Sequence, residues 1–186
     1  MLWGAPSSPD PAWTSAALAA QHVLGYNEPD NSGQANTIPS IAASAWLSYV
    51  QPLTGKVSIG GPAVTNAGNG VLPYAGLGWL DSFLQDCVGC EIDFMPVHWY
   101  ANDTAANFEA YLEEAYTRAG NRPIWVTEFM LQDSEANQIA WLKEVLPWMD
   151  SQSWIGRYAY FGVFETFLVN GAGTGLSEIG QAYATI

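Results

Sequence analysis

The fold is indicated most clearly by Val23-Leu24-Gly25-Tyr26-Asn27-Glu28-Pro29-Asp30 and by a later segment of the same kind, Ile124-Trp125-Val126-Thr127-Glu128-Phe129. Each is a short apolar run that stops at a glutamate, a pattern typical of a buried strand whose last residue reaches into a pocket. In a parallel α/β barrel the carboxyl ends of the strands line one face. The sequence therefore predicts that Glu28 and Glu128 face each other across that surface.

Two facing carboxylates are the working groups of a glycosidase. Cleavage of a glycosidic bond needs one carboxylic acid to protonate the departing oxygen and one carboxylate to stabilise or trap the sugar cation. The acid should have a raised pKa and the nucleophile a normal or low one, so their surroundings should differ. The alternative for either glutamate taken alone is a solvated residue in a loop after a strand.

Strands and helices are expected to alternate along the rest of the chain, which favours a parallel sheet. The predicted strands are the stub Met1–Trp3, His22–Asn27, Val57–Pro62, Ile92–His98, Ile124–Glu128 and Arg157–Gly162. The predicted helices are an Ala-rich helix through Ala20, one starting at Thr37, Leu77–Asp86, one over Phe108–Ala119, one that includes Ile139–Met149, and Ser177–Ala184.

Two of these helices have features that the structure can test. In the second helix we expect Thr37 as the N-cap with Pro39 in the first turn. Its apolar face should include Ile41, Ala45, Leu47 and Val50. In the fourth helix, Phe108, Tyr111, Leu112, Ala115, Tyr116 and Ala119 fall on one face, and Gly120 follows as a stop signal.

Composition excludes several classes of partner. The chain of 186 residues has 5 Lys and Arg against 18 Asp and Glu, a formal charge of −13 with no basic run. Nucleic acid and anionic membrane surfaces are therefore poor partners. The two histidines, His22 and His98, fall on different predicted strands and no carboxylate-rich loop is present, so we expect no metal site. No cofactor is expected either. Aromatic residues make up 13% of the chain, and we weigh sugar-stacking platforms against a Trp-rich core.

Cys87 and Cys90 form a C-x-x-C motif. A redox motif would open a helix after a strand, whereas this pair follows a predicted helix and precedes a strand. A zinc site would need two further ligands that the chain does not offer. The interpretation we favour is a disulfide that closes a tight loop, as in a secreted protein.

Several blocks, in order along the chain, resemble glycoside hydrolase family 128. They are Gly25–Asp30 with Gln34–Asn36, Trp79–Phe83, Asp93–Phe94 with Val97–Tyr100, Trp125–Phe129 and Arg157–Gly162. The resemblance runs essentially end to end as a single domain over residues 1–186 and implies an endo-β-1,3-glucanase with a (β/α)8 barrel and a retaining mechanism. In that family the two glutamates follow strands four and seven. The six predicted strands would then be strands three to eight, and two strands, their helices and the start of strand three would precede Met1.

The resemblance also implies roles for individual residues. Glu28 would be the acid/base and Glu128 the nucleophile. Asn27 is suited to hydrogen-bond the substrate's 2-hydroxyl group, and His98 and Tyr100 would orient Glu128 and touch the sugar. The expected substrate-binding set is Asn27, Asn66, His98, Trp99, Tyr100, Trp125 and Tyr160. The alternative for the rings of Trp99, Trp125, Tyr160 and Phe161 is that they fill the barrel, and His98 alone could be a structural histidine.

Two other functions remain open at this point. One is a non-catalytic β-glucan-binding protein, and the other is a glycosidase of different β-linkage specificity. An incomplete barrel would expose unpaired strand edges, so we expect low stability or self-association, whereas a complete barrel would be a monomer. The partner expected in either case is a β-glucan polysaccharide or oligosaccharide. The expected location is extracellular or in the cell wall, although no signal peptide begins the chain as given.

Overall fold

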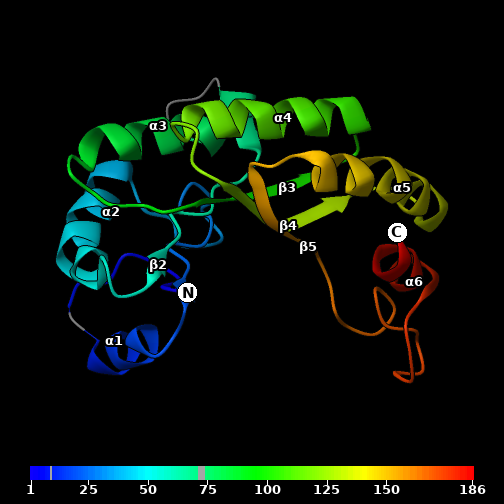
Figure 1. Ribbon diagram of the computed structural model, residues 1–186, viewed down its shortest axis with the longest axis horizontal. Coiled ribbons are helices and arrows are strands. Elements are labelled where there is room, and N and C mark those ends of the chain that lie inside the picture. The colour runs from blue at the N-terminus through cyan, green and yellow to red at the C-terminus, as the bar shows by residue number, and fades with distance from the viewer. Residues whose placement is uncertain (9, 71–73) are drawn as a thin grey trace.

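The computed structural model describes residues 1–8, 10–70 and 74–186. Within these residues the chain forms a curved row of parallel strands with helices along the outside (Figure 1). The strands are β1 (His22–Val23), β2 (Ser58–Ile59), β3 (Met95–Ala101), β4 (Ile124–Leu131) and β5 (Ile155–Tyr160). The helices are α1 (Pro11–Leu18), α2 (Pro39–Ala45), α3 (Gly76–Asp86), α4 (Ala105–Arg118), α5 (Glu135–Ser151) and α6 (Glu178–Thr185).

The strands form two parallel sheets, β1-β2 and β3-β4-β5. Parallel bridges between Gly60 and Phe94 and between Val64 and Val97 connect the two sheets, so the strand order follows the chain order. The predicted α/β class with parallel pairing is confirmed. Closure into a barrel stays a prediction, because β1 and β5 lie at opposite ends of this order and no pairing joins them among the described residues.

The stub Met1–Trp3 is not a strand, which corrects the prediction. Its backbone nevertheless lies beside the chain that leaves β1, because the Leu2 amide donates to the Leu24 carbonyl at 3.0 Å. The Asn27 amide donates to the Trp3 carbonyl at 2.8 Å. These bonds hold Trp3 next to the end of the stretch that carries Glu28.

The start of α2 differs from the prediction. Thr37 is not the N-cap: its hydroxyl donates to the Ala35 carbonyl, and the residue that precedes the helix is Ile38. After Ala45 the chain widens into a π-helical turn (Trp46–Val50) and tightens into a 3₁₀ turn (Gln51–Leu53). Two of the four predicted inward residues, Ala45 and Val50, are buried, while Ile41 and Leu47 are 57% and 45% exposed. The buried face instead follows Ala42, Ala43 and Trp46, which are at helical spacing from one another.

Helix α4 follows the prediction closely. Thr104 caps it by accepting from the Asn107 amide, and Gly120 follows it at φ 68°. Its buried face packs on β3 and β4, where Phe108 lies among Trp99, Phe129 and Trp141. A short 3₁₀ turn (Ala67–Gly70) precedes α3. Among the described helices, none is both long and apolar enough to cross a membrane.

Candidate active site

Glu28 lies where the chain turns away from β1. The backbone beyond β1 stays paired with the next segment, since the Ala63 amide donates to Tyr26 and the Glu28 amide donates to Ala63. Gly25 makes this approach possible, because a Cβ there would lie 2.7 Å from the Gly61 carbonyl oxygen. Glu28 itself has φ 43°, in the left-handed region, and is only 7% exposed.

Glu128 lies within β4 and reaches the same place from the opposite side. The pairing of β3 with β4 shifts between Val97 and His98, so that Val97 pairs with Val126 while His98 pairs with Glu128. This irregularity lets both His98 and Glu128 approach Glu28. The Glu128 side chain is 32% exposed, more than the 10% of Glu28.

His98 and Tyr100, both on β3, connect the two glutamates. His98 Nδ1 lies 2.9 Å from Glu28 Oε1 and 3.6 Å from Glu128 Oε2. The Tyr100 hydroxyl donates to Glu128 Oε2 at 2.5 Å. Asn31 Nδ2 donates to the other Glu28 oxygen at 2.8 Å. Taken one from each side chain, an oxygen of Glu28, an oxygen of Glu128 and His98 Nδ1 lie within 4.8 Å of one another.

The electrostatics of Glu28 differ from the prediction. The hydrogen bond with His98 lowers the pKa of Glu28, more than burial raises it, and the bond from Asn31 lowers it further. The expectation of a raised pKa for Glu28 is therefore wrong for the site without substrate.

Burial, together with the Glu128 carboxylate, raises the pKa of Tyr100 far above its usual range. The Tyr100 phenol therefore keeps its proton and serves as a hydrogen-bond donor.

An open cleft of about 670 Å³ surrounds the two glutamates. Its lining residues are Met1, Trp3, Asn27, Glu28, Asn31, Gln34, Thr65, Asn66, Tyr100, Glu128 and Phe161. Asn66 is fixed to Tyr100 by two bonds between its side-chain amide and the Tyr100 backbone, at 3.2 and 3.3 Å. Asn27 Nδ2 donates to Gln34 Oε1 at 3.1 Å. The cleft thus presents amide and carboxylate groups held in place by neighbouring side chains.

The structure brings together only part of the predicted substrate-binding set. Asn27, Asn66 and Tyr100 line the cleft, and His98 lies beneath it, 1% exposed, in contact with both glutamates.

Three predicted rings lie elsewhere. Trp99 is 3% exposed and stacks on Trp141, on the helix side of β3. Tyr160 is equally buried, and its hydroxyl donates to Gln138 at 2.6 Å. Trp125, near the start of β4, stacks on Phe94 with 3.8 Å between the ring centroids, and the Arg157 guanidinium lies over the Trp125 ring. We therefore assign these three rings to packing rather than to substrate binding.

Sequence reasoning missed two exposed rings in the cleft. Trp3 is 51% exposed, and Phe161 is 38% exposed and packs edge-on against Tyr100. For Phe161, the interpretation from the sequence was a ring that fills the barrel, which its exposure corrects. Its position directly after β5 was the available signal, since residues at strand ends reach the catalytic face. Asn31, Gln34 and Thr65 were also not assigned, because their contact with the cleft depends on how the loops fold.

The C-x-x-C motif is a disulfide, as expected. Cys87 and Cys90 are bonded, with Cα atoms 5.4 Å apart, directly after α3. Neither residue contributes to the cleft. Glu28, His98 and Glu128 have possible ligand atoms within 4.8 Å of one another, but His98 Nδ1 is already hydrogen-bonded to Glu28 and Glu128 already accepts from the Tyr100 hydroxyl.

A family model described as the glycosyl hydrolase catalytic core matches residues 1–183. The chain belongs to this family. As a glycosyl hydrolase catalytic core it is similar to solved structures from family 128, which confirms the resemblance drawn from the sequence. One is a curdlan-specific exo-β-1,3-glucanase from Blastomyces gilchristii, solved with glucose. It is 40% identical, with a TM-score of 0.87 over 100% of this chain and 80% of that chain.

Two further relatives of this catalytic core come from a bacterium and a yeast. An endo-β-1,3-glucanase from Amycolatopsis mediterranei, solved with laminaritriose, is 32% identical, with a TM-score of 0.84 over 98% of this chain and 79% of that chain. Alkali-sensitive linkage protein 1 of Schizosaccharomyces pombe is 32% identical over 180 residues. That match covers 87% of this chain, which spans about a third (32%) of the length of that curated relative.

Proposed function

We propose that this protein is a retaining glycoside hydrolase that cleaves β-1,3-glucan within the chain, with Glu128 as nucleophile and Glu28 as acid/base. The observation that carries the proposal is the spacing of the two carboxylates, which have oxygens within 4.8 Å of each other across an open cleft. Retaining enzymes hold this pair about 5–5.5 Å apart, whereas inverting enzymes leave about 6.5–9.5 Å for a water molecule. The close pair therefore favours retention.

The linkage comes from the relatives. The Blastomyces and Amycolatopsis structures are both β-1,3-glucanases by their descriptions, and the second holds laminaritriose. They differ in mode, because the first is an exo-enzyme and the second an endo-enzyme. The higher identity to the exo-enzyme makes exo-cleavage the second candidate. The length distribution of early products from a laminarin-type polymer separates the two: an endo-enzyme releases mixed lengths, and an exo-enzyme releases one short product.

In the first half of the reaction, a Glu128 oxygen attacks the anomeric carbon while the glycosidic C–O bond breaks. Glu28 gives its proton to the departing oxygen. The Tyr100 hydroxyl, bonded to Glu128 Oε2, restricts that carboxylate and leaves its other oxygen to react. In the second half, Glu28 removes a proton from water, the water oxygen bonds to the anomeric carbon, and the ester to Glu128 breaks.

His98 can serve both protonation states of Glu28 through one contact. When Nδ1 carries the hydrogen, it donates to the ionised Glu28 carboxylate, and this is the contact that lowers the pKa of Glu28. When the hydrogen is on Nε2, Nδ1 accepts a bond from the protonated Glu28 carboxyl group. The 2.9 Å contact thus supports Glu28 as the acid in the first step and as the base in the second.

We place the protein outside the cell or in the cell wall as part of the same proposal. The Cys87–Cys90 disulfide supports this location, because such bonds persist in oxidising compartments. A polymeric glucan in a cell wall would also be accessible only there.

The test of the proposal is chemical rescue with azide and an activated β-1,3-glucoside. Glu28→Ala and Glu128→Ala should each lower kcat by about 10⁴-fold. Azide should then give a β-glycosyl azide with Glu28→Ala and an α-glycosyl azide with Glu128→Ala, since it replaces the base in the first and the nucleophile in the second. Glu113→Ala, at an exposed glutamate on α4, is the matched control and should keep wild-type activity. The same azide anomer from both variants would refute the assigned roles.

A further inference from the structure

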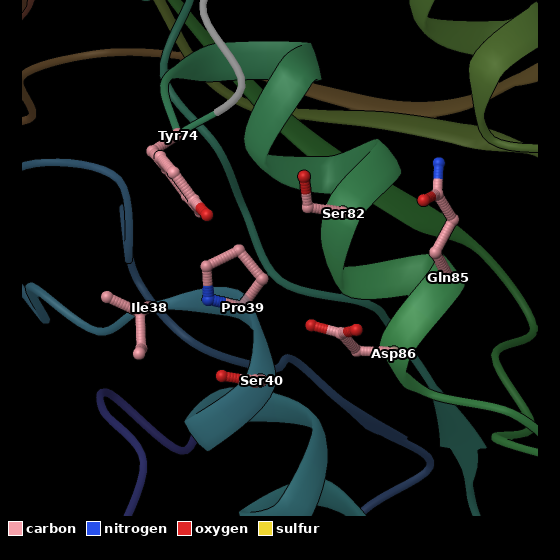
Figure 2. Close-up of a pocket in the computed structure, with 7 residues that line it drawn as sticks. All are labelled: Ile38, Pro39, Ser40, Tyr74, Ser82, Gln85 and Asp86. Atoms are coloured by element: carbon pink, nitrogen blue, oxygen red, sulfur yellow. The ribbon is translucent and has the colours of Figure 1, made fainter.

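A groove on the helical side of the molecule carries a solvent-facing tyrosine. The start of α2 (Ile38–Ser40) forms one wall, and Tyr74 with Ser82, Gln85 and Asp86 forms the other (Figure 2). The groove has a volume of about 290 Å³. Tyr74 is 65% exposed, and Figure 2 shows its ring and the Asp86 carboxylate extending into the space between α2 and α3.

The chemistry of this groove fits a sugar better than it fits an ion or a protein. An exposed aromatic ring beside Ile38 and Pro39 gives a flat apolar surface on which the C–H face of a pyranose can pack. Hydroxyl, amide and carboxylate groups surround that surface, and they can exchange hydrogen bonds with sugar hydroxyls. Among the lining residues that the structure describes, Asp86 supplies the single charge, and it is negative, so these residues offer an anionic ligand no counter-charge.

The groove is joined to the catalytic cleft by one loop. The segment from Glu28 to Ile38 runs from the acid/base residue to the groove wall, and the Thr37 amide closes it by donating to the Pro29 carbonyl at 2.8 Å. The other wall is tied to the same loop, because Asp30 Oδ2 accepts from the Gly76 amide at 2.8 Å. Trp79 Nε1 also donates to the Thr37 carbonyl at 2.8 Å. The two walls are therefore fixed relative to the cleft.

We propose that this groove is a second binding site for neutral glucan, which retains the protein on an insoluble polymer while the cleft acts on it. The proposal rests on the proposed function for the linkage of the glucan. A second contact with the same polymer raises the local concentration of substrate at the cleft without changing the chemistry in it. The groove should therefore matter for insoluble glucan and not for short soluble chains.

Retention is measured on particles of insoluble linear β-1,3-glucan with full-length protein carrying Glu128→Gln, so that the particles stay intact. Adding Tyr74→Ala should raise the apparent Kd for the particles about fivefold. Tyr74→Phe, which keeps the ring, should stay within twofold of the parent. Val88→Ala, at a site 81% exposed and outside the groove, is the control and should change nothing. In the active protein, Tyr74→Ala should leave kcat/KM for laminarihexaose unchanged.

Three results would overturn the inference. The first is an unchanged Kd for Tyr74→Ala, and the second is an equal loss of kcat/KM on laminarihexaose, which would make Tyr74 part of the cleft. The third is loss of the Tyr74-dependent retention in 1 M NaCl, because a neutral ligand is insensitive to salt. If instead the wild type proved inactive while retention still depended on Tyr74, the groove would stand and the proposed catalysis would fail.

Discussion

Replacing Tyr100 by phenylalanine removes a single oxygen atom and tests whether the Tyr100 hydroxyl positions Glu128. The substitution removes the hydroxyl that donates to Glu128 Oε2 at 2.5 Å and leaves the ring in its edge-on contact with Phe161. No cavity forms, because only an oxygen at the edge of the cleft is lost. A hydrogen bond to a charged group contributes about 1.5–3 kcal/mol, which corresponds to a roughly 10- to 150-fold fall in kcat if it is lost in the transition state.

The assay is steady-state hydrolysis of laminarihexaose at saturating substrate, with the melting temperature measured in parallel. Tyr158→Phe is the matched control, since the Tyr158 hydroxyl also donates to a carboxylate, Asp150 Oδ1 at 2.7 Å, away from the cleft. The control should keep its kcat. A kcat for Tyr100→Phe within twofold of wild type, or an effect confined to KM, would refute the argument that this bond positions Glu128.

Three further predictions concern the proton, the core and the disulfide. His98→Leu removes the bond that lowers the pKa of Glu28, so the basic limb of the pH profile of kcat/KM should move to higher pH, while His98→Gln, which keeps a donor, should move it less. A basic limb of the His98→Leu profile that stays at the same pH or moves to lower pH would count against the His98–Glu28 contact as the cause of the lowered pKa. Trp99→Ala should lower the free energy of unfolding in urea by about 3–5 kcal/mol, because the ring is buried in the core, and Trp99→Phe should cost less. A loss below about 1 kcal/mol for the alanine variant would contradict the packing role. Cys87→Ser should cost about 2 kcal/mol or less, since the loop that the disulfide closes is short, and a melting temperature insensitive to the change would mean that the bond contributes nothing.

The sequence predicted the approach of the two glutamates and the buried face of α4, because each depends on a pattern within a few consecutive residues. A short apolar run before a glutamate indicates a buried segment that carries the glutamate to the cleft, and Glu28 and Glu128 approach each other as expected. The strand ends were not predicted, because β1 stops at Val23 and β4 continues to Leu131. The amphipathic face of α4 was equally clear, from the spacing of Phe108, Leu112 and Ala115. In these cases the spacing of apolar residues along the chain matches the set of side chains that the fold buries.

The errors arose where long-range packing overrides a local pattern. Ile41 and Leu47 fit one helical face, but the neighbouring face that includes Ala42, Ala43 and Trp46 is the one packed against the core. Trp99 follows His98 in the sequence and therefore points to the opposite face of β3, among the helices rather than into the cleft. Alternation along the strand could have separated these two residues. The shift of pairing that sets His98 opposite Glu128 depends on both strands, and neither sequence alone reveals it.

The lowered pKa of Glu28 had a similar origin. Its burial was foreseeable from the apolar run before it, and burial alone would raise the pKa. The opposing effect comes from His98, 70 residues away in the sequence, and from Asn31 in the following loop. Only the assembled site shows which of these influences is larger.

The left-handed backbone at Glu28 has a consequence for the evolution of this position. A φ of 43° costs a residue with a Cβ about 1–2 kcal/mol relative to glycine. Of two variants that both lack the carboxylate, Glu28→Gly should therefore be more stable than Glu28→Ala, the reverse of the order found in ordinary strands and helices. Selection for folding alone would drift toward glycine here. The backbone conformation at this position therefore disfavours any residue with a Cβ, and whatever advantage a glutamate has here must come from its side chain.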